Sequence, residues 1–205
     1  MATQKKSLVA KERDEEERTA WRKEAGGVAP ELFMWVDECG THTSMTRTRA
    51  RAPKGERAYG KVPRNRGKNT TLIAGMTLSG MEASMAFEGA TDKDAFEAYV
   101  EHFLAPALCA GQVVVMDRLG AHRTRRVREL IEKRGCRLWL LPSYSPDLNP
   151  IEEAFSKIKA LLKPAAARTK EALLEAIAEA LSAVTPEDAK GWFAHCAYGA
   201  EAQQS

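Results

Sequence analysis

The sequence predicts an α/β protein whose mixed five-stranded sheet is covered by helices on both faces. Five short apolar segments are bounded by turn-forming residues, as expected of buried strands. Two of them are separated only by Ser79-Gly80, which predicts an antiparallel hairpin. The later segments alternate with stretches of helical periodicity, an order typical of strands joined through helices.

The first thirty residues carry mixed charge and few apolar side chains. Residues 4–25 have Trp21 as one of their few apolar points, which predicts an exposed helix or an arm outside the core. Two glycines and Pro30 then interrupt this segment. We therefore divide the chain into a charged N-terminal arm or linker over residues 1–30 and a folded domain over residues 31–205.

The first half of this domain contains three predicted strands. Residues 32–36 form a continuous apolar run that predicts a buried strand ending at Asp37. Residues 43–70 are rich in Arg, Gly, Pro and Thr and predict a loop. The hairpin strands follow over residues 71–78 and 81–87.

The next segments alternate between helix and strand. Thr91 is the predicted N-cap of a helix, and residues 113–116 predict a buried strand that ends at Asp117. A helix over residues 121–134 and a short strand over 138–140 come next. The two strand-end aspartates meet if their strands are neighbours in the sheet.

The end of the chain is predicted to be helical. Residues 142–150 are rich in Pro, Ser, Asp and Asn and predict a loop. A helix starts at Pro150, and a second covers residues 169–183. Thr185-Pro186 opens a last short helix, because proline is favoured in the first turn.

Basic residues are concentrated in two segments, although the net charge is only +3. The first lies between Arg47 and Lys68 and contains a single acid, Glu56. The second lies between Arg118 and Arg128. One such cluster is usually a solvated face, whereas two clusters that each follow a candidate aspartate favour a polyanionic partner.

Other features exclude several classes of protein. No apolar run approaches the ~20 residues needed to span a membrane. The polar start of the chain predicts no secretory signal. Four scattered cysteines without a Cys-x-x-Cys pair favour reduced thiols in a cytosolic protein over disulfides or a structural zinc site.

Asp37, Asp117 and Glu152 are candidate metal ligands. Phosphodiester cleavage needs a strong nucleophile and neutralised phosphate charge, which two divalent ions supply. Mg²⁺ is typically held by a few carboxylates together with phosphate and water. The residues alone leave other interpretations open. Each aspartate suits a cap of the following turn, Glu152 fits a capping box with Asn149 as N-cap, and Glu153 is an alternative to its neighbour.

The amino-acid sequence around these acids resembles the mariner-like transposase superfamily, in particular its bacterial insertion-sequence branch. VDECGT at 36–41 resembles the first-aspartate block, and VMDRLGAH at 115–122 resembles the second. LPSYSPDLNPIE at 141–152 resembles the third and is the most specific. Thirty-four residues separate Asp117 from Glu152, the spacing of this branch.

The resemblance implies a ribonuclease-H-like fold in which residues 31–205 are the catalytic domain of a DDE transposase. It implies that Asp37, Asp117 and Glu152 bind two Mg²⁺ or Mn²⁺ ions and catalyse nicking at transposon ends. The freed 3′-hydroxyl would then attack target DNA, usually at a TA dinucleotide. The implied partner is double-stranded DNA, bound by a homodimer in the bacterial cytoplasm at the nucleoid.

The family also implies phosphate contacts from a basic loop after the first block, here RAPKGER at 51–57. Such contacts give salt-sensitive affinity without sequence preference. His122 is also a candidate to position DNA, or else a helix N-terminal histidine satisfied by the backbone. The residues expected to bind DNA are Arg47, Arg49, Arg51, Lys54, Arg57, Lys68, Arg118 and His122.

The chain departs from the family pattern at two points. The second block usually has Asn after its aspartate, where this chain has Arg118, a permanent cation that either competes with a metal or reaches outward to a phosphate. Complete relatives carry an N-terminal helix-turn-helix domain that reads transposon ends. About thirty residues precede the first strand here, so we expect that domain to be absent, either lost or supplied as a separate partner product.

Three functions are therefore compared. The first is a transposase catalytic domain that cleaves DNA and transfers strands, favoured by the intact triad. The second is an inactive DNA-binding transposase remnant or inhibitor, favoured by Arg118 and the missing recognition domain. The third is a host ribonuclease-H-type nuclease, and the sequence of residues 145–150 argues against it.

Overall fold

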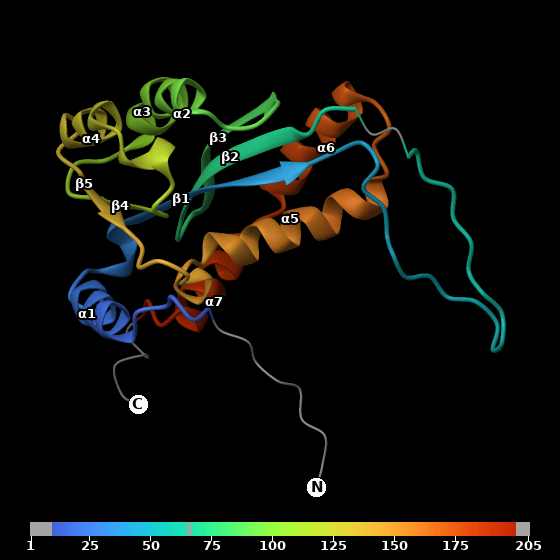
Figure 1. Ribbon diagram of the computed structural model, residues 1–205, viewed down its shortest axis with the longest axis horizontal. Coiled ribbons are helices and arrows are strands. Elements are labelled where there is room, and N and C mark those ends of the chain that lie inside the picture. The colour runs from blue at the N-terminus through green and yellow to red at the C-terminus, as the bar shows by residue number, and fades with distance from the viewer. Residues whose placement is uncertain (1–9, 65–66, 200–205) are drawn as a thin grey trace, which may run out of the picture.

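The computed structural model describes residues 10–64 and 67–199, and a mixed five-stranded sheet forms its centre (Figure 1). The strand order is β3-β2-β1-β4-β5. The pairs β1–β2 and β2–β3 are antiparallel, whereas β1–β4 and β4–β5 are parallel. The predicted fold class is confirmed. The strands are β1 (Phe33–Thr41), β2 (Thr70–Thr77), β3 (Gly80–Glu88), β4 (Val113–Met116) and β5 (Arg137–Leu140).

Helices cover both faces of this sheet. They are α1 (Glu15–Ala25), α2 (Lys93–Tyr99), α3 (Ala105–Ala107), α4 (Arg125–Glu132), α5 (Ile151–Ala165), α6 (Lys170–Ser182) and α7 (Pro186–His195). A π-helical turn, Val100–Leu104, joins α2 to α3. Short 3₁₀ turns lie at Pro30–Leu32, Gly120–Arg123 and Pro146–Leu148. Asp92, one residue after the predicted Thr91, caps α2 by accepting a hydrogen bond from the backbone of Ala95.

Strand β1 divides the core into two layers because successive side chains of a strand point to opposite faces. Phe33 and Trp35 pack with α1, α5, α6 and α7 on one face. Met34 and Val36 pack with α2, the π-helical turn and α4 on the other face (Figure 1). The continuous apolar run of β1 is explained by burial on both sides.

Strand β1 is longer than predicted, so Asp37 lies within it and not at its end. The parallel pairing with β4 stops at Trp35, opposite Val115. The antiparallel pairing with β2 continues from Trp35 to Thr41 and extends the strand. Asp37 therefore lies just beyond the carboxyl end of the parallel pair, although β1 does not stop there.

Helix α1 belongs to the core, so the prediction of an exposed arm is wrong for its described part. Trp21 is only 7% exposed, and its ring lies edge-on to that of Trp139, with centroids 5.4 Å apart. Arg18 and Ala25 are buried on the same face of the helix. Residues 4–9 lie outside the described residues, and the domain boundary near residue 30 stays a prediction.

The segment between β1 and β2 extends away from the body of the protein (Figure 1). Its described residues contain no helix or strand, as predicted. The guanidinium of Arg168 donates hydrogen bonds to the carbonyls of Thr43, at 2.8 Å, and Met45, at 3.0 Å. This contact ties the start of the segment to the turn between α5 and α6. No helix among the described residues is long and apolar enough to cross a membrane.

Candidate active site

Asp37, Asp117 and Glu152 line one pocket with a volume of about 420 Å³. Asp37 comes from β1, and Asp117 directly follows β4, the parallel neighbour of β1. Glu152 lies in the first turn of α5. The sheet order thus brings together three acids that are far apart in the sequence.

Asp37 is a buried carboxyl group, only 8% exposed. One oxygen accepts a hydrogen bond from the Glu38 backbone at 2.7 Å, and the other accepts one from Nδ2 of Asn149 at 2.8 Å. Burial raises the pKa of Asp37 from its usual 3.8 to about 7, and the negative charges of Asp117 and Glu152 add to this effect. Its hydrogen-bond donors are all neutral, so a cation in the pocket would stabilise its ionised form.

Asp117 is held by a buried histidine. Nδ1 of His122 lies 2.6 Å from Oδ1 of Asp117, although its N–H is not well aligned with the oxygen. Nε2 of His122 lies 3.1 Å from a Glu38 oxygen, and the ring packs on Phe96 with centroids 4.1 Å apart. Burial opposes protonation of His122, but these two carboxylates raise its pKa to about 9, so the imidazole is charged at neutral pH. Burial of Asp117 is likewise outweighed by the adjacent His122 and by a hydrogen bond from the Leu119 backbone, which lower its pKa.

His122 has no exposed surface, so the prediction that it contacts DNA is wrong. The alternative of a histidine satisfied by the backbone is also wrong, because its ring nitrogens face Asp117 and Glu38. The sequence shows His122 five residues after Asp117, but its partner Glu38 is revealed only by the fold.

Glu152 does not form the predicted capping box. Helix α5 has Pro150 at its N-cap and no side-chain cap, and the Asn149 side chain donates to Asp37. Glu152 is exposed at the pocket, whereas Glu153 contacts the His195 side chain on α7. The geometry thus favours Glu152 over Glu153 as the third acid of the pocket.

Arg118 lines the same pocket but forms an ion pair with Glu17 of α1. Its charge is therefore balanced by a residue outside the three acids. Glu17 was missed by sequence reasoning because α1 was assigned to an exposed arm.

Helix α1 also supports the loop that carries Asn149. The guanidinium of Arg18 binds both oxygens of Asp147, at 3.0 and 2.6 Å. Nε1 of Trp21 donates to the hydroxyl of Tyr198 at 3.0 Å, and that hydroxyl donates to the carbonyl of Leu148 at 2.8 Å. The helix is thus connected to two consecutive residues that precede Asn149.

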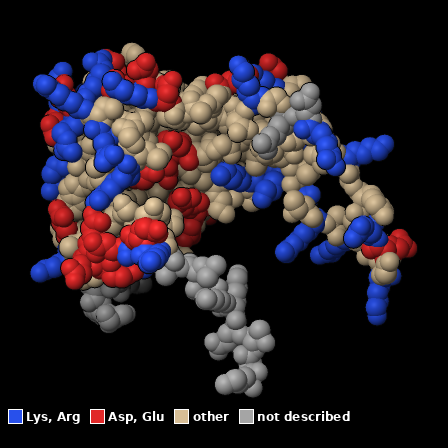
Figure 2. Space-filling model, viewed as in Figure 1, with Lys and Arg blue, Asp and Glu red and all other residues tan. Residues whose placement is uncertain are grey.

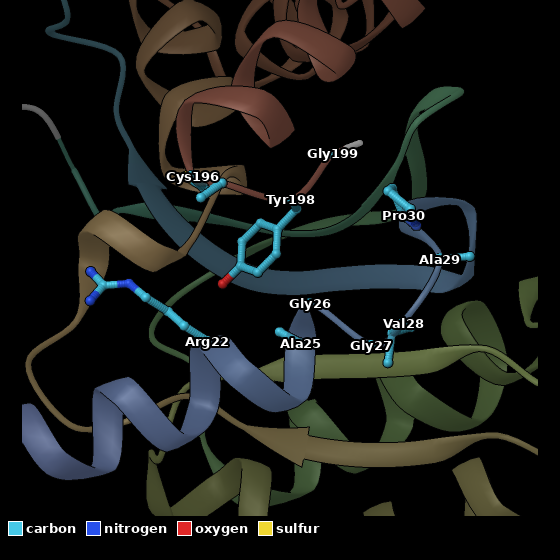
Figure 3. Close-up of a pocket in the computed structure, with 11 residues that line it drawn as sticks. Arg22, Ala25, Gly26, Gly27, Val28, Ala29, Pro30, Cys196, Tyr198 and Gly199 are labelled. Carbon is cyan, nitrogen blue, oxygen red and sulfur yellow. The ribbon is translucent and has the colours of Figure 1, made fainter. Parts of the chain in front are cut away.

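Figure 3 shows Tyr198 beside a second cavity, with a volume of about 410 Å³, between the end of α1 and the residues after α7. Its lining is mostly glycine and small apolar residues, with Arg22 as the charged side chain. No carboxylate lines it. The pocket of the three acids is therefore the candidate active site.

The basic residues of the β1–β2 segment lie away from this pocket. Figure 2 shows Lys and Arg side chains along the extended segment at the right of the view. Lys68 lies 3.5 Å from Glu88, whereas the other five predicted DNA contacts here have no ion-pair partner among the described residues. All are exposed, namely Arg47, Arg49, Arg51, Lys54 and Arg57. Of the predicted DNA-binding set, the structure places Arg118 in the lining of the acid pocket and His122 against Asp117.

The pocket does not by itself form a complete cation site. Across residues 10–64 and 67–199, no three His, Cys, Asp or Glu side chains lie close enough together to hold one ion. Its donors are nevertheless carboxylates, the ligands that Mg²⁺ and Mn²⁺ prefer. Phosphate and water usually complete such sites.

Comparison with known proteins agrees with this geometry. Residues 33–174 match the family model of the DDE superfamily endonuclease. No curated protein sequence matches the chain.

Solved structures of Mos1 transposase have a similar fold. The Mos1 strand transfer complex is 18% identical with a TM-score of 0.72, and the match covers 100% of this chain and 64% of that one. The Mos1 mariner paired-end complex with Mn is 18% identical with a TM-score of 0.70, covering 100% and 65%. The catalytic domain of Mos1 mariner transposase is 14% identical with a TM-score of 0.59, covering 92% and 93%.

The chain thus spans slightly less than two thirds of the Mos1 chains in those complexes. It matches nearly the full length of the separate Mos1 catalytic domain. Because the family model covers well over half of the sequence, the protein belongs to the DDE superfamily endonucleases, and its fold is the ribonuclease-H-like fold of a transposase catalytic domain.

Proposed function

We propose that this chain is a transposase catalytic domain that cleaves double-stranded DNA at transposon ends and transfers the freed strands to target DNA. The observation that carries the proposal is the meeting of Asp37, Asp117 and Glu152 in one pocket of a DDE-family fold. Each acid comes from a different element, so their convergence is a property of the whole fold.

Divalent ions are the proposed cofactors, held by Asp37, Asp117 and Glu152. Asp37 is the main reason to expect a bound cation. Its carboxyl group is buried beside two other acids, and its own hydrogen-bond donors are all neutral. Two Mg²⁺ or Mn²⁺ ions would neutralise phosphate charge and activate the attacking oxygen. Mos1 paired-end complexes with Mg and with Mn support this choice.

The surrounding residues prepare the acids for this role. The charged His122 keeps Asp117 ionised and fixes one of its oxygens. Asn149 and the Glu38 backbone fix the two oxygens of Asp37, and each oxygen retains a second lone pair. Glu17 balances the charge of Arg118, which limits the competition between this cation and a bound metal.

The proposed substrate is duplex DNA, and the exposed basic residues between β1 and β2 would bind its phosphates. Complexes of Mos1 with a transposon end and after strand transfer support this proposal. We further propose a TA target, a homodimer on DNA, and a helix-turn-helix partner product that recognises the ends. The protein would then act at the nucleoid of the bacterial cytoplasm.

An inactive remnant or inhibitor is the second candidate, favoured by Arg118 beside the acids. Both candidates bind DNA, so cleavage separates them. The test is nicking of supercoiled plasmid in Mg²⁺ or Mn²⁺ by the wild type and by Asp37→Asn, Asp117→Asn and Glu152→Gln.

Glu153→Gln is the matched control, because Glu153 is adjacent in sequence but faces His195. We expect the wild type and the control to nick, and the three acid variants to lose at least ~100-fold in rate, because losing even a residue that only orients a metal ligand typically costs ~10- to 100-fold. Binding without nicking by the wild type would favour the remnant. Loss of nicking in Glu153→Gln, with activity kept in Glu152→Gln, would contradict the assignment of the third acid.

A further inference from the structure

Tyr144 has an unusual backbone conformation at the mouth of the acid pocket. It lies in the loop between β5 and α5 with a φ of 56°. A bulky L-residue rarely adopts this left-handed conformation. Such conformations persist where the surrounding structure enforces them, and they cluster at functional sites.

The conformation of Tyr144 gives its side chain few contacts inside the protein. It is 58% exposed. Among the described residues it has no hydrogen-bond partner and no ring contact, whereas the hydroxyl of Tyr198 has both a donor and an acceptor. The strained backbone therefore presents an unpartnered aromatic ring to solvent.

Tyr144 is part of an apolar wall of the acid pocket. Leu119, two residues after Asp117, lines the same pocket and is 47% exposed. Pro142 and Pro146 line it on either side of Tyr144 in the sequence. The pocket thus combines carboxylates with exposed aromatic and aliphatic surface.

This combination fits one chemical group of the proposed substrate. A nucleobase is flat and uncharged, stacks on aromatic side chains, and is attached through its sugar to the phosphate that the acids would process with bound cations. Stacking of one base on an aromatic side chain strengthens binding roughly 10- to 100-fold. A base inside a duplex cannot stack in this way unless it leaves the helix.

We infer that Tyr144, together with Leu119, forms a stacking site for one unpaired nucleobase next to the scissile phosphate. The inference rests on the proposed function, because DNA must enter the acid pocket. The site would hold the cleaved strand in place and would favour DNA that is already unpaired at this position.

Photocrosslinking tests the contact without requiring cleavage. The probe is a duplex with a short single-stranded overhang that contains 5-iodouracil at successive positions, bound in Ca²⁺. We expect one position to crosslink to Tyr144, identified by peptide mass spectrometry. The crosslink should persist in Tyr144→Phe and disappear in Tyr144→Leu, which keeps apolar bulk but removes the aromatic ring.

Plasmid nicking tests the consequence. We expect Tyr144→Leu to raise KM roughly tenfold, as loss of one stacked base predicts, and Tyr144→Phe to stay within about twofold of the wild type. Leu161→Ala is the control for a partly exposed apolar residue, because Leu161 is 39% exposed on α5 and does not line the pocket.

Tyr144→Gly separates a structural role from a binding role. Glycine adopts positive φ without strain, so this variant should be at least as thermally stable as the wild type while it loses nicking like Tyr144→Leu. Normal nicking by the glycine and leucine variants, without a crosslink to Tyr144, would overturn the inference and leave the proposed function intact. If the wild type does not nick, the proposed function fails, and the crosslink still decides whether Tyr144 binds a base.

Discussion

Two requirements conflict at Asp37. The metal ligand that we propose Asp37 to be must be ionised, but burial beside other acids favours the protonated form and raises the pKa of Asp37 to about 7. Without a cation, the folded protein therefore binds more protons here than the unfolded chain between pH 3.8 and about 7. The contribution of Asp37 to stability is fully present at low pH and is lost as pH rises through this range.

This conflict predicts a pH-dependent effect of Asp37→Asn in EDTA. The shift corresponds to at most about 4 kcal/mol, so the variant should melt up to roughly 10 °C above the wild type at pH 8.5, with the difference falling to about a quarter of this at pH 4.5. Thermal unfolding across this range, with Glu153→Gln as control, measures the effect. A difference that does not change with pH would contradict the raised pKa.

Arg118 gives a second prediction at the scale of single residues. Because Glu17 balances its charge, Arg118→Asn should change the nicking rate by less than about threefold. Glu17→Gln should free the guanidinium beside the acids and raise the half-saturating Mn²⁺ concentration by up to ~10-fold. Glu16→Gln, at an adjacent exposed position, is the control. Strong activation by Arg118→Asn would instead show that Arg118 silences the site.

The same residues show where local sequence rules fail. Asn149, Pro150 and Glu152 fit a capping box, and the start of α5 was predicted correctly. The Asn149 side chain nevertheless donates to Asp37, which is 112 residues away in the sequence. The Asn149 amide thus donates to a carboxyl group that only the fold brings within reach.

At the scale of elements, α1 is the part of the fold that sequence patterns described least well. Arg18, Trp21 and Ala25 share one face of the helix, but a charged residue in the middle of that face conceals its amphipathic character. Arg18 is buried because Asp147 and Glu15 pair with its guanidinium. The guanidinium of Arg18 is thus shielded from solvent by the side chains that pair with it, and it lies near the surface of the protein.

The Arg18–Asp147 pair should be important for stability. Asp147→Ala leaves the guanidinium largely unpaired and should cost about 2–3 kcal/mol, which lowers the melting temperature by roughly 5–10 °C. The double variant Arg18→Met/Asp147→Ala should be less destabilised than Asp147→Ala alone. Asp94→Ala on α2 is the control for an exposed acid. Equal melting temperatures for the wild type and Asp147→Ala would contradict this role.

The segment between β1 and β2 was predicted correctly as an irregular basic connection. Replacing five of its cations that form no ion pair among the described residues, Arg47, Arg49, Arg51, Lys54 and Arg57, with Gln should weaken DNA binding. Each lost phosphate contact should reduce the slope of log K against log salt by about 0.9. Fluorescence anisotropy at several salt concentrations measures the slope, with Lys93→Gln on α2 as control. An unchanged slope would exclude this segment from the DNA interface.

At the scale of the whole molecule, we expect the protein to bind DNA with little preference for base sequence. Within the described residues, the predicted DNA contacts are exposed Lys and Arg side chains, which read phosphate charge and not base identity. The chain should therefore bind unrelated duplexes with affinities within about tenfold of one another at moderate salt. A gel shift that shows strong preference for one inverted-repeat sequence would contradict this expectation.

Fold class and the order of the strands along the chain were predictable from the sequence, because apolar runs and turn residues are local signals. Asp37, Asp117 and Glu152 were singled out only by the resemblance of their surroundings to the transposase family, since their positions alone also fitted helix and turn caps. The neighbour relation of β1 and β4 was not predictable, since no local pattern records which strands pair. The supports of the site were missed for the same reason. Glu38, Asn149 and Glu17 reach their partners only through this pairing and through the packing of α1.

The pairing of β1 with β4 also has a consequence for biosynthesis. The antiparallel strands β1, β2 and β3 are consecutive and can pair while the ribosome is still translating the rest of the chain. Asp117 and Glu152 join Asp37 only after β4 has paired beside β1 and the start of α5 has emerged. A polypeptide that has not yet reached the start of α5 therefore lacks the assembled acids and cannot form the proposed metal site.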